Sequence, residues 1–225
     1  MRNLIPKTFL ATAIAVGALC PGALRAQVAD FVQTNLVSDI PGLATITDPQ
    51  LVNPWGVAHS TTSPFWTSNQ GTNTATLYAV TDKTTVTKTN INPPAGFVLI
   101  PPGGVGAVGP TGQVSNTNTS SFLVTNGDGN FAHFIFANLN KTISAWDAGT
   151  TAFIQATTPG AVYTGLAING AQTRLYAAND AGMGSVDVFD STFARSASRP
   201  AHSSTPRFPP GSSRSTCKRS AATFT

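Results

Sequence analysis

The chain has 225 residues, enough for one large domain or two small ones. Charged residues make up only 10% of it and glutamate is absent, a composition more typical of extracellular β proteins than of helical cytosolic ones. The net charge of +4 comes from the two ends, since residues 27–194 carry four basic side chains against nine aspartates. A basic face on the folded part is therefore not expected, and we predict no nucleic-acid partner.

The first 26 residues have the pattern of a signal peptide. Arg2 and Lys7 precede an apolar stretch, Thr8–Leu19, that is too short to span a bilayer comfortably, and cleavage after Ala26 fits the pattern. We expect export to the periplasm or the extracellular space, with an N-terminal anchor as the alternative. No membrane span is expected after cleavage, and residues 27–195 contain no cysteine for a disulfide.

From residue 27 onward, strand-like runs alternate with turn residues, and three segments share one pattern. These segments are Pro54–Asp82, Pro110–Asp147 and Tyr163–Asp190. Each starts with a glycine in a short apolar strand, continues to an aromatic or apolar strand (FWTSN, FIFAN, LYAAN), and turns into an alternating strand (TATLYAV, TISAWD, SVDVFD). The glycines are Gly56, Gly112 and Gly165, spaced by 56 and 53 residues. The second copy carries an additional expected strand, Ser120–Thr125.

Repeats of this length with several strands each are typical of β-propeller blades. We predict an all-β protein over residues 27–195, an incomplete β-propeller with about three of six blades, built from antiparallel sheets. A β-sandwich is the alternative, and Pro93–Gly104 is expected to be a long loop between the first two copies. The side chains expected to pack between neighbouring blades are Val57, Phe65, Leu77, Phe134, Ile135, Leu175, Tyr176 and Val188.

The pattern ends near Arg195, and residues 196–225 are rich in Ser, Arg and Pro. We expect this tail to be disordered. It could be a polybasic arm for an acidic partner or an ordinary disordered terminus. A frameshifted reading of a longer propeller gene is favoured over both because the composition changes so abruptly. That interpretation makes the chain a truncated version with exposed blade faces.

The body resembles NHL-like and related six-bladed propellers, most clearly in LYAANDAGMGSVDVFD. More specifically, the stretch Gln33–Ala58, QTNLVSDIPGLATITDPQLVNPWGVA, is similar to an uncharacterised family of secreted bacterial proteins, some with a C-terminal PEP-CTERM sorting signal. The resemblance covers about Asp30 to Arg195. It implies a propeller of roughly twice this length and no established activity.

Few residues are candidates for chemistry. Asn126, Asp128 and Asn130 place oxygen-bearing side chains at alternate positions, as a calcium loop does, although a glycine-rich hairpin turn explains them more simply. His59, near a strand end, and Trp55 are candidates for ligand binding. His133 is expected to pack on a strand face. The histidines do not form a metal triad, and G-x-S-x-G is absent.

The three tryptophans, Trp55, Trp66 and Trp146, could form a sugar-binding surface, but packing between blades accounts for them more simply. The sequence therefore favours an exported propeller of unknown activity that acts as a binding or interaction scaffold, with no resident cofactor and a cell-surface or extracellular partner. The alternative is a secreted calcium-dependent hydrolase or lactonase of the propeller type.

Overall fold

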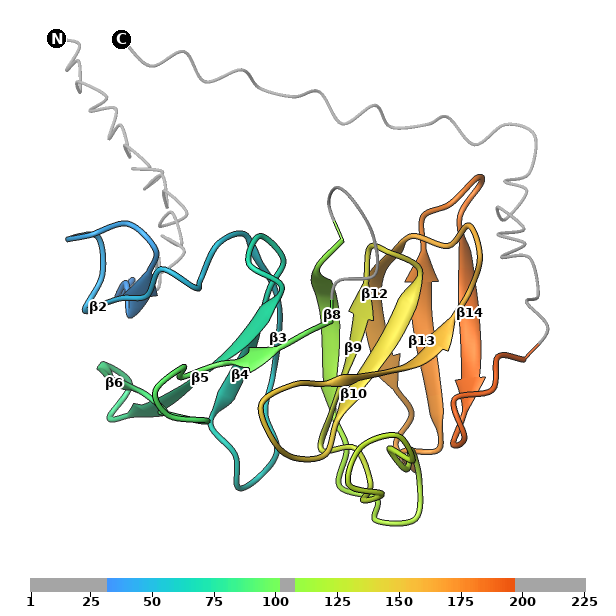
Figure 1. Ribbon diagram of the computed structural model, residues 1–225. Coiled ribbons are helices and arrows are strands. Elements are labelled where there is room, and N and C mark those ends of the chain that lie inside the picture. The colour runs from blue at the N-terminus through green and yellow to red at the C-terminus, as the bar shows by residue number, and fades with distance from the viewer. Residues whose placement is uncertain (1–31, 102–107, 197–225) are drawn as a thin grey trace, which may run out of the picture. The chain divides into compact units, whose positions relative to one another are not determined.

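Backbone hydrogen bonds group the strands into three antiparallel sheets and one short parallel pair (Figure 1). The computed structural model describes residues 32–101 and 108–196, and the strands in it belong to one unit, Thr34–Thr225. These ranges contain no helix that could cross a membrane. The expected signal peptide and nearly all of the expected tail lie outside the described residues.

The first sheet comes from the first sequence repeat. It has the order β3-β4-β5-β6, and β7 pairs with the start of β5. Its strands are β3 (Pro54–Ala58), β4 (Phe65–Asn69), β5 (Thr74–Thr81), β6 (Thr85–Lys88) and β7 (Val98–Leu99). Upstream of it, β1 (Val37–Ser38) and β2 (Ile46–Thr47) form the parallel pair.

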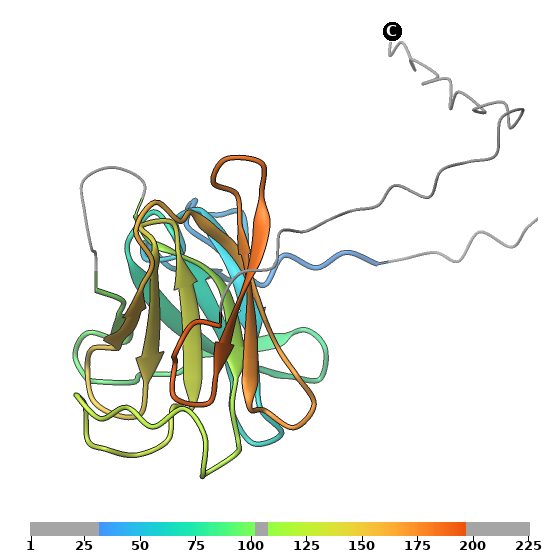
Figure 2. The same ribbon diagram turned by 90° about the vertical axis from the view of Figure 1, so that its right-hand side faces the viewer.

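The second and third sheets repeat the same up-and-down order along the chain. The second sheet contains β8 (Pro110–Ser115), β9 (Phe134–Asn138), β10 (Thr142–Trp146) and β11 (Phe153–Thr157). The third sheet contains β12 (Tyr163–Ile168), β13 (Arg174–Asn179) and β14 (Ser185–Asp190). Figure 2 views the molecule from the side of this third sheet.

The three sheets lie side by side with their first strands adjacent, β3 against β8 and β8 against β12. The repeated glycines make this approach possible. A Cβ added to Gly56 would lie 3.0 Å from the Gln113 nitrogen, and one added to Gly112 would lie 2.7 Å from the Gly165 carbonyl carbon. No side chain fits at such distances, so the backbones of neighbouring sheets can meet only at glycine. This is the arrangement of β-propeller blades, not of a two-sheet sandwich.

Two hydrophobic clusters fill the spaces between the sheets. Phe134 and Phe136 face the first sheet, and Ile135 and Ala137 face the third. Because the second sheet is covered on both faces, β9 is buried throughout, and its first four residues are all apolar. The prediction of an all-β protein made of antiparallel sheets is confirmed.

Several detailed expectations are wrong. Val57 is 62% exposed, Phe65 39% and Tyr176 37%, so these three do not pack between sheets, and Val188 is only half-buried. They lie on the outer faces of the first and third sheets, where no further sheet of the described residues covers them. Leu77, Phe134, Ile135 and Leu175 are buried as expected.

One predicted strand and one predicted loop also differ from the structure. Ser120–Thr125 is not a strand but makes one isolated bridge, Leu123 with Phe131, because the positive φ of 54° at Phe122 turns the chain. Phe122 and Val124 instead enter the core from a loop. The predicted loop Pro93–Gly104 contains the short strand β7 in its described part.

Candidate functional site

An open cavity of about 480 Å³ lies between the first and second sheets, next to the loops that follow β3 and β8. This volume falls in the range of small-molecule sites, about 300–1,000 Å³. No Asp, Lys or Arg lines it. The lining residues are Ser60, Thr62, Ser63, Pro64, Trp66, Leu77, Ile91, Asn116, Thr117, Phe131, His133, Phe134 and Trp146.

Aromatic side chains form one wall of this cavity. The rings of Trp66 and Phe134 stack at 4.1 Å between centroids, and Trp146 packs on Trp66 at 4.8 Å. Trp66 and Phe134 are almost fully buried, whereas Trp146 is half-buried. The Trp146 indole N–H donates to the Gly149 carbonyl at 2.9 Å, which fixes the orientation of the ring. A ligand would therefore meet mainly the fixed ring of Trp146, with Trp66 and Phe134 packed behind it.

His133 continues this wall toward the solvent. Its ring lies edge-on to Phe131 at 4.5 Å and 5.9 Å from Trp146. Its backbone is held between the Trp146 carbonyl and the Asn116 amide. In the described part of the chain, neither imidazole nitrogen has a hydrogen-bond partner, so both remain available to a ligand. The expectation that His133 packs on a strand face thus describes its ring contacts but misses its place in a cavity.

Asn116, although polar, is occupied with the loop itself. Its amide donates to the Ala132 carbonyl at 2.9 Å, and its side-chain oxygen accepts the Asn118 amide at 3.1 Å. Across the opening, Ser60 and Ser63 hold their loop by reciprocal side-chain to backbone bonds. Both rims are therefore shaped by local hydrogen bonds before any ligand arrives.

The two residues predicted to bind a ligand lie outside the lining of the cavity. His59 is exposed and donates from Nδ1 to the Ser60 carbonyl at 2.9 Å, and its ring packs on Phe65 at 5.0 Å. Trp55 is 47% exposed on β3. The structure therefore brings Trp66 and Trp146 together but leaves Trp55 apart.

The predicted calcium residues form a tight turn. The amides of Gly127 and Gly129 both donate to the Val124 carbonyl, and Gly129 has a φ of +79°. The Asn126 side chain is already engaged, because its oxygen accepts from Gln155 at 2.7 Å and its amide donates to Ile154. Asp128 and Asn130 are exposed. In residues 32–101 and 108–196, no group of three His, Cys, Asp or Glu side chains is placed to hold a metal.

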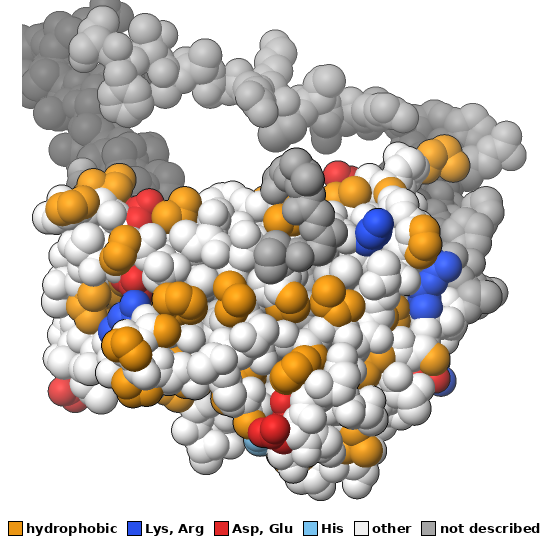
Figure 3. Space-filling model, viewed as in Figure 1, with side chains coloured by type: hydrophobic (Ala, Val, Ile, Leu, Met, Phe, Trp, Pro, Cys, Tyr) orange, Lys and Arg blue, Asp and Glu red, His pale blue; other side chains and the backbone are white. Residues whose placement is uncertain are grey.

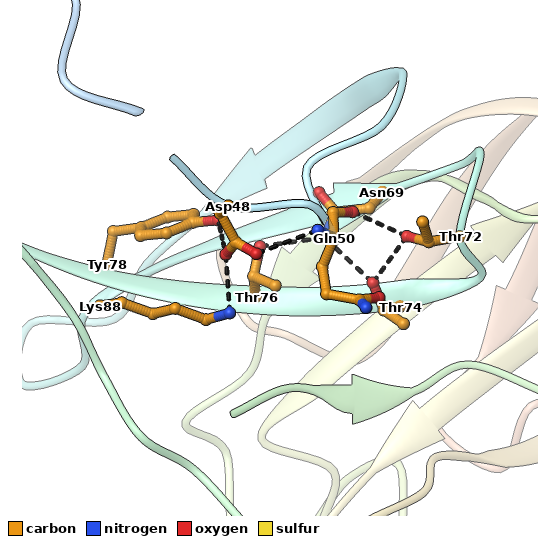
Figure 4. Close-up of polar contacts among 8 residues, drawn as sticks. All are labelled: Asp48, Gln50, Asn69, Thr72, Thr74, Thr76, Tyr78 and Lys88. Carbon is orange, nitrogen blue, oxygen red and sulfur yellow. Dashed lines mark hydrogen bonds and ion pairs between the residues drawn. The ribbon is translucent and has the colours of Figure 1, made fainter. Parts of the chain in front are cut away.

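A buried carboxylate, Asp48, anchors residues 48–50 to the first sheet (Figure 4). Asp48 is 1% exposed; its Oδ2 accepts from the Tyr78 hydroxyl at 2.6 Å and from the Lys88 ammonium at 2.8 Å. Nearby, the Thr72 hydroxyl donates to the Gln50 carbonyl at 2.7 Å. These bonds attach residues 48–50 to strands β5 and β6 and to the turn that precedes β5.

The third sheet contains a similar cluster. Asp187 is 1% exposed; its Oδ2 accepts from the Tyr163 hydroxyl at 2.9 Å and its Oδ1 lies 3.4 Å from the Arg195 guanidinium. Asp187 is thus a buried structural residue that the sequence analysis did not single out. Alternation in SVDVFD places Asp187 on the same face as the buried Phe189, and this signal could have identified it.

These bonds shift the pKa values of the buried groups. Burial by itself raises the pKa of Asp48, but hydrogen bonds from Lys88 and Tyr78 outweigh it and bring the pKa below the ordinary 3.8. Burial and the neighbouring carboxylate raise the pKa of Tyr78. Burial also raises that of Tyr163. Both tyrosines therefore remain protonated donors, and the arrangement is suited to holding strands, not to proton transfer.

The asparagine that ends the second strand of each sheet has one repeated role. Asn69 donates to Thr74 and Thr76, Asn138 to Thr142 and Ser144, and Asn179 to Asp187. In each sheet this side chain ties the second strand to the third. The N that ends FWTSN, FIFAN and LYAAN is therefore a structural residue.

Comparison with known proteins shows a likeness to solved structures but no match among families or curated proteins. Among solved structures, the chain is similar to selenomethionine-substituted virginiamycin B lyase from Staphylococcus aureus, a seven-bladed β-propeller, at a TM-score of 0.40 and 14% sequence identity. The likeness covers 66% of this chain and 41% of that one, so this chain spans less than half of the lyase.

Proposed function

We propose that this protein is an exported binding protein that takes an uncharged, hydroxylated ring, such as a sugar unit, in the cavity between the first and second sheets. The observation that carries the proposal is the aromatic wall of Trp66, Phe134 and Trp146, which ends in the unpartnered imidazole of His133. The half-buried ring of Trp146 offers an apolar surface for one face of a sugar, Trp66 and Phe134 support it from behind, and the sugar's hydroxyl groups reach polar side chains at the rim.

The uncharged lining supports this class of ligand. A carboxylate or phosphate would find no Lys or Arg in the cavity, and a cation would find no Asp. The seryl and threonyl side chains at the rim, Ser60, Thr62 and Thr117, offer hydroxyl groups that both donate and accept. The signal-peptide pattern and the resemblance to secreted bacterial six-bladed propellers support a role outside the cytoplasm.

The experiment is a titration of the purified chain with neutral oligosaccharides, followed by calorimetry and by tryptophan fluorescence, since Trp66 and Trp146 line the cavity. We expect binding in the micromolar to millimolar range, about −8 to −4 kcal/mol. Trp146→Ala and His133→Ala should each weaken it by about tenfold or more.

Trp55→Ala is the matched control, because Trp55 is a tryptophan outside the cavity lining. It should bind like the unaltered chain. If no neutral sugar binds, or if Trp55→Ala weakens binding as much as Trp146→Ala, the proposal is wrong.

A further inference from the structure

The repeated pattern of contacts between sheets leaves one face of the third sheet uncovered, together with the Val57 and Phe65 part of the outer face of the first sheet. The repeat aligns Gly56, Gly112 and Gly165, and the first two receive the backbone of the next sheet. A Cβ added to Gly165 would instead meet only the Ala178 Cβ, at 3.7 Å. The third copy thus keeps a glycine whose close neighbour is missing among the described residues.

The side chains around Gly165 likewise lack the covering sheet that their equivalents in the first two sheets have. Trp66, Ile135 and Tyr176 occupy equivalent positions in the second strands of the three sheets. Trp66 and Ile135 are buried against the next sheet, whereas Tyr176 is 37% exposed. On the third strand, Ala75 and Ile143 are fully buried, whereas the equivalent Val186 is 44% exposed. We call this surface the open face of the third sheet; it comprises Gly165, Ala167, Tyr176, Val186 and Val188.

The first sheet carries the complementary surface. Phe134 packs the second sheet against the first by stacking on Trp66. Its equivalent in the first sheet, Phe65, has no such partner and is 39% exposed. Gln113 donates to the Gly56 carbonyl of the preceding sheet, and its equivalent, Val57, is 62% exposed. The rest of this face is already covered, since Thr67, Thr76 and Tyr78 are buried and residues 48–50 bond to its Thr72 and Tyr78 part. The surface open to a partner is therefore the part that carries Val57 and Phe65.

We propose that the open face of the third sheet binds the first sheet of a second copy of this chain. The repeat defines the contacts: Phe65 of one copy stacks on Tyr176 of the other, as Phe134 stacks on Trp66, and Val57 lies against Gly165. Both surfaces belong to the same chain, so two copies joined head to tail at both ends form a closed pair with twofold symmetry. Six sheets then surround one axis. Figure 3 shows a different side of the molecule, on which apolar side chains are scattered and charged ones are few.

Sedimentation velocity of the full chain across a range of concentrations tests the proposal. We expect a species of twice the chain mass that dissociates on dilution. Tyr176→Glu and Phe65→Arg should each weaken the association by at least about tenfold, because each puts a charge into a stacked contact. Met183→Glu, on the exposed turn after β13, is the control and should leave it unchanged.

Mixing the two charged variants separates a specific pair from general aggregation. In the mixed pair, one contact has native Phe65 and Tyr176, and the other joins an arginine to a glutamate. We expect the mixture to form the species of doubled mass at concentrations where each variant alone is monomeric. A monomeric unaltered chain, an equal effect of Met183→Glu, or a mixture that stays monomeric would each overturn the proposal, provided circular dichroism shows that the variants are folded.

Discussion

Gly112→Ala tests whether the glycines set the distance between sheets. The new Cβ would lie 2.7 Å from the Gly165 carbonyl carbon and 2.8 Å from the Gly165 Cα. Carbon atoms rest about 3.5–4.0 Å apart, so β8 and β12 must separate by roughly 1 Å, which forfeits about a quarter to a half of the dispersion energy at that contact. We expect a free energy of unfolding about 1–3 kcal/mol lower, the usual cost of an overpacked core.

Gly170→Ala is the matched control. Gly170 lies in an exposed turn, has no described atom within 4 Å of its added Cβ, and does not have a left-handed φ. Both substitutions reduce the entropy of the unfolded chain equally, which by itself stabilises by about 0.4–1 kcal/mol. Urea unfolding followed by circular dichroism gives the difference between the variants. If Gly112→Ala is as stable as Gly170→Ala, the close approach of β8 and β12 is wrong.

Three further substitutions test the buried polar contacts. Asp48→Asn should lower the free energy of unfolding by about 1–3 kcal/mol at neutral pH. Since folding lowers the pKa of Asp48, its contribution is present above the unfolded value of 3.8 and is lost as the pH falls below it, so the unaltered chain and the variant should converge in acid unfolding curves. Asn138→Ala removes the bonds to Thr142 and Ser144 in a fully buried site and should cost about 1–3 kcal/mol in urea unfolding, whereas an equal cost for an exposed asparagine such as Asn130 would argue against this role. Tyr163→Phe, which keeps the ring but removes the donor to Asp187, should cost about 0.5–1.5 kcal/mol by thermal unfolding, and no change would show that the hydroxyl adds nothing to the fold.

The strands that the repeat analysis missed are those with weak local signals. β6 follows a turn in which Asp82 and Lys83 both have positive φ, 52° and 65°. Such a turn usually contains glycine or asparagine, so the pair Asp82 and Lys83 did not indicate a hairpin turn before β6. β11, Phe153–Thr157, is an outer strand of half-buried residues without clear alternation.

The candidate site was predictable only in part. The sequence raised the possibility of a tryptophan surface, but it could not tell that Trp66 and Trp146 meet while Trp55 stays apart. These residues come from β4, β10 and β3 in two sheets, and their distances depend on how the sheets pack. His133 was interpreted from its strand alone, and its neighbour across the cavity, Ser60, is 73 residues away in the sequence.

Local pattern determined most strands of the three repeats, the antiparallel sheets and the repeated glycines, because alternation and turn chemistry act between residues near one another in the chain. Tertiary structure alone decided which faces are covered. Tyr176 and Ile135 occupy the same place in their repeats, yet one is 37% exposed and the other fully buried. The difference is the presence of a neighbouring sheet, which a residue's own repeat does not encode.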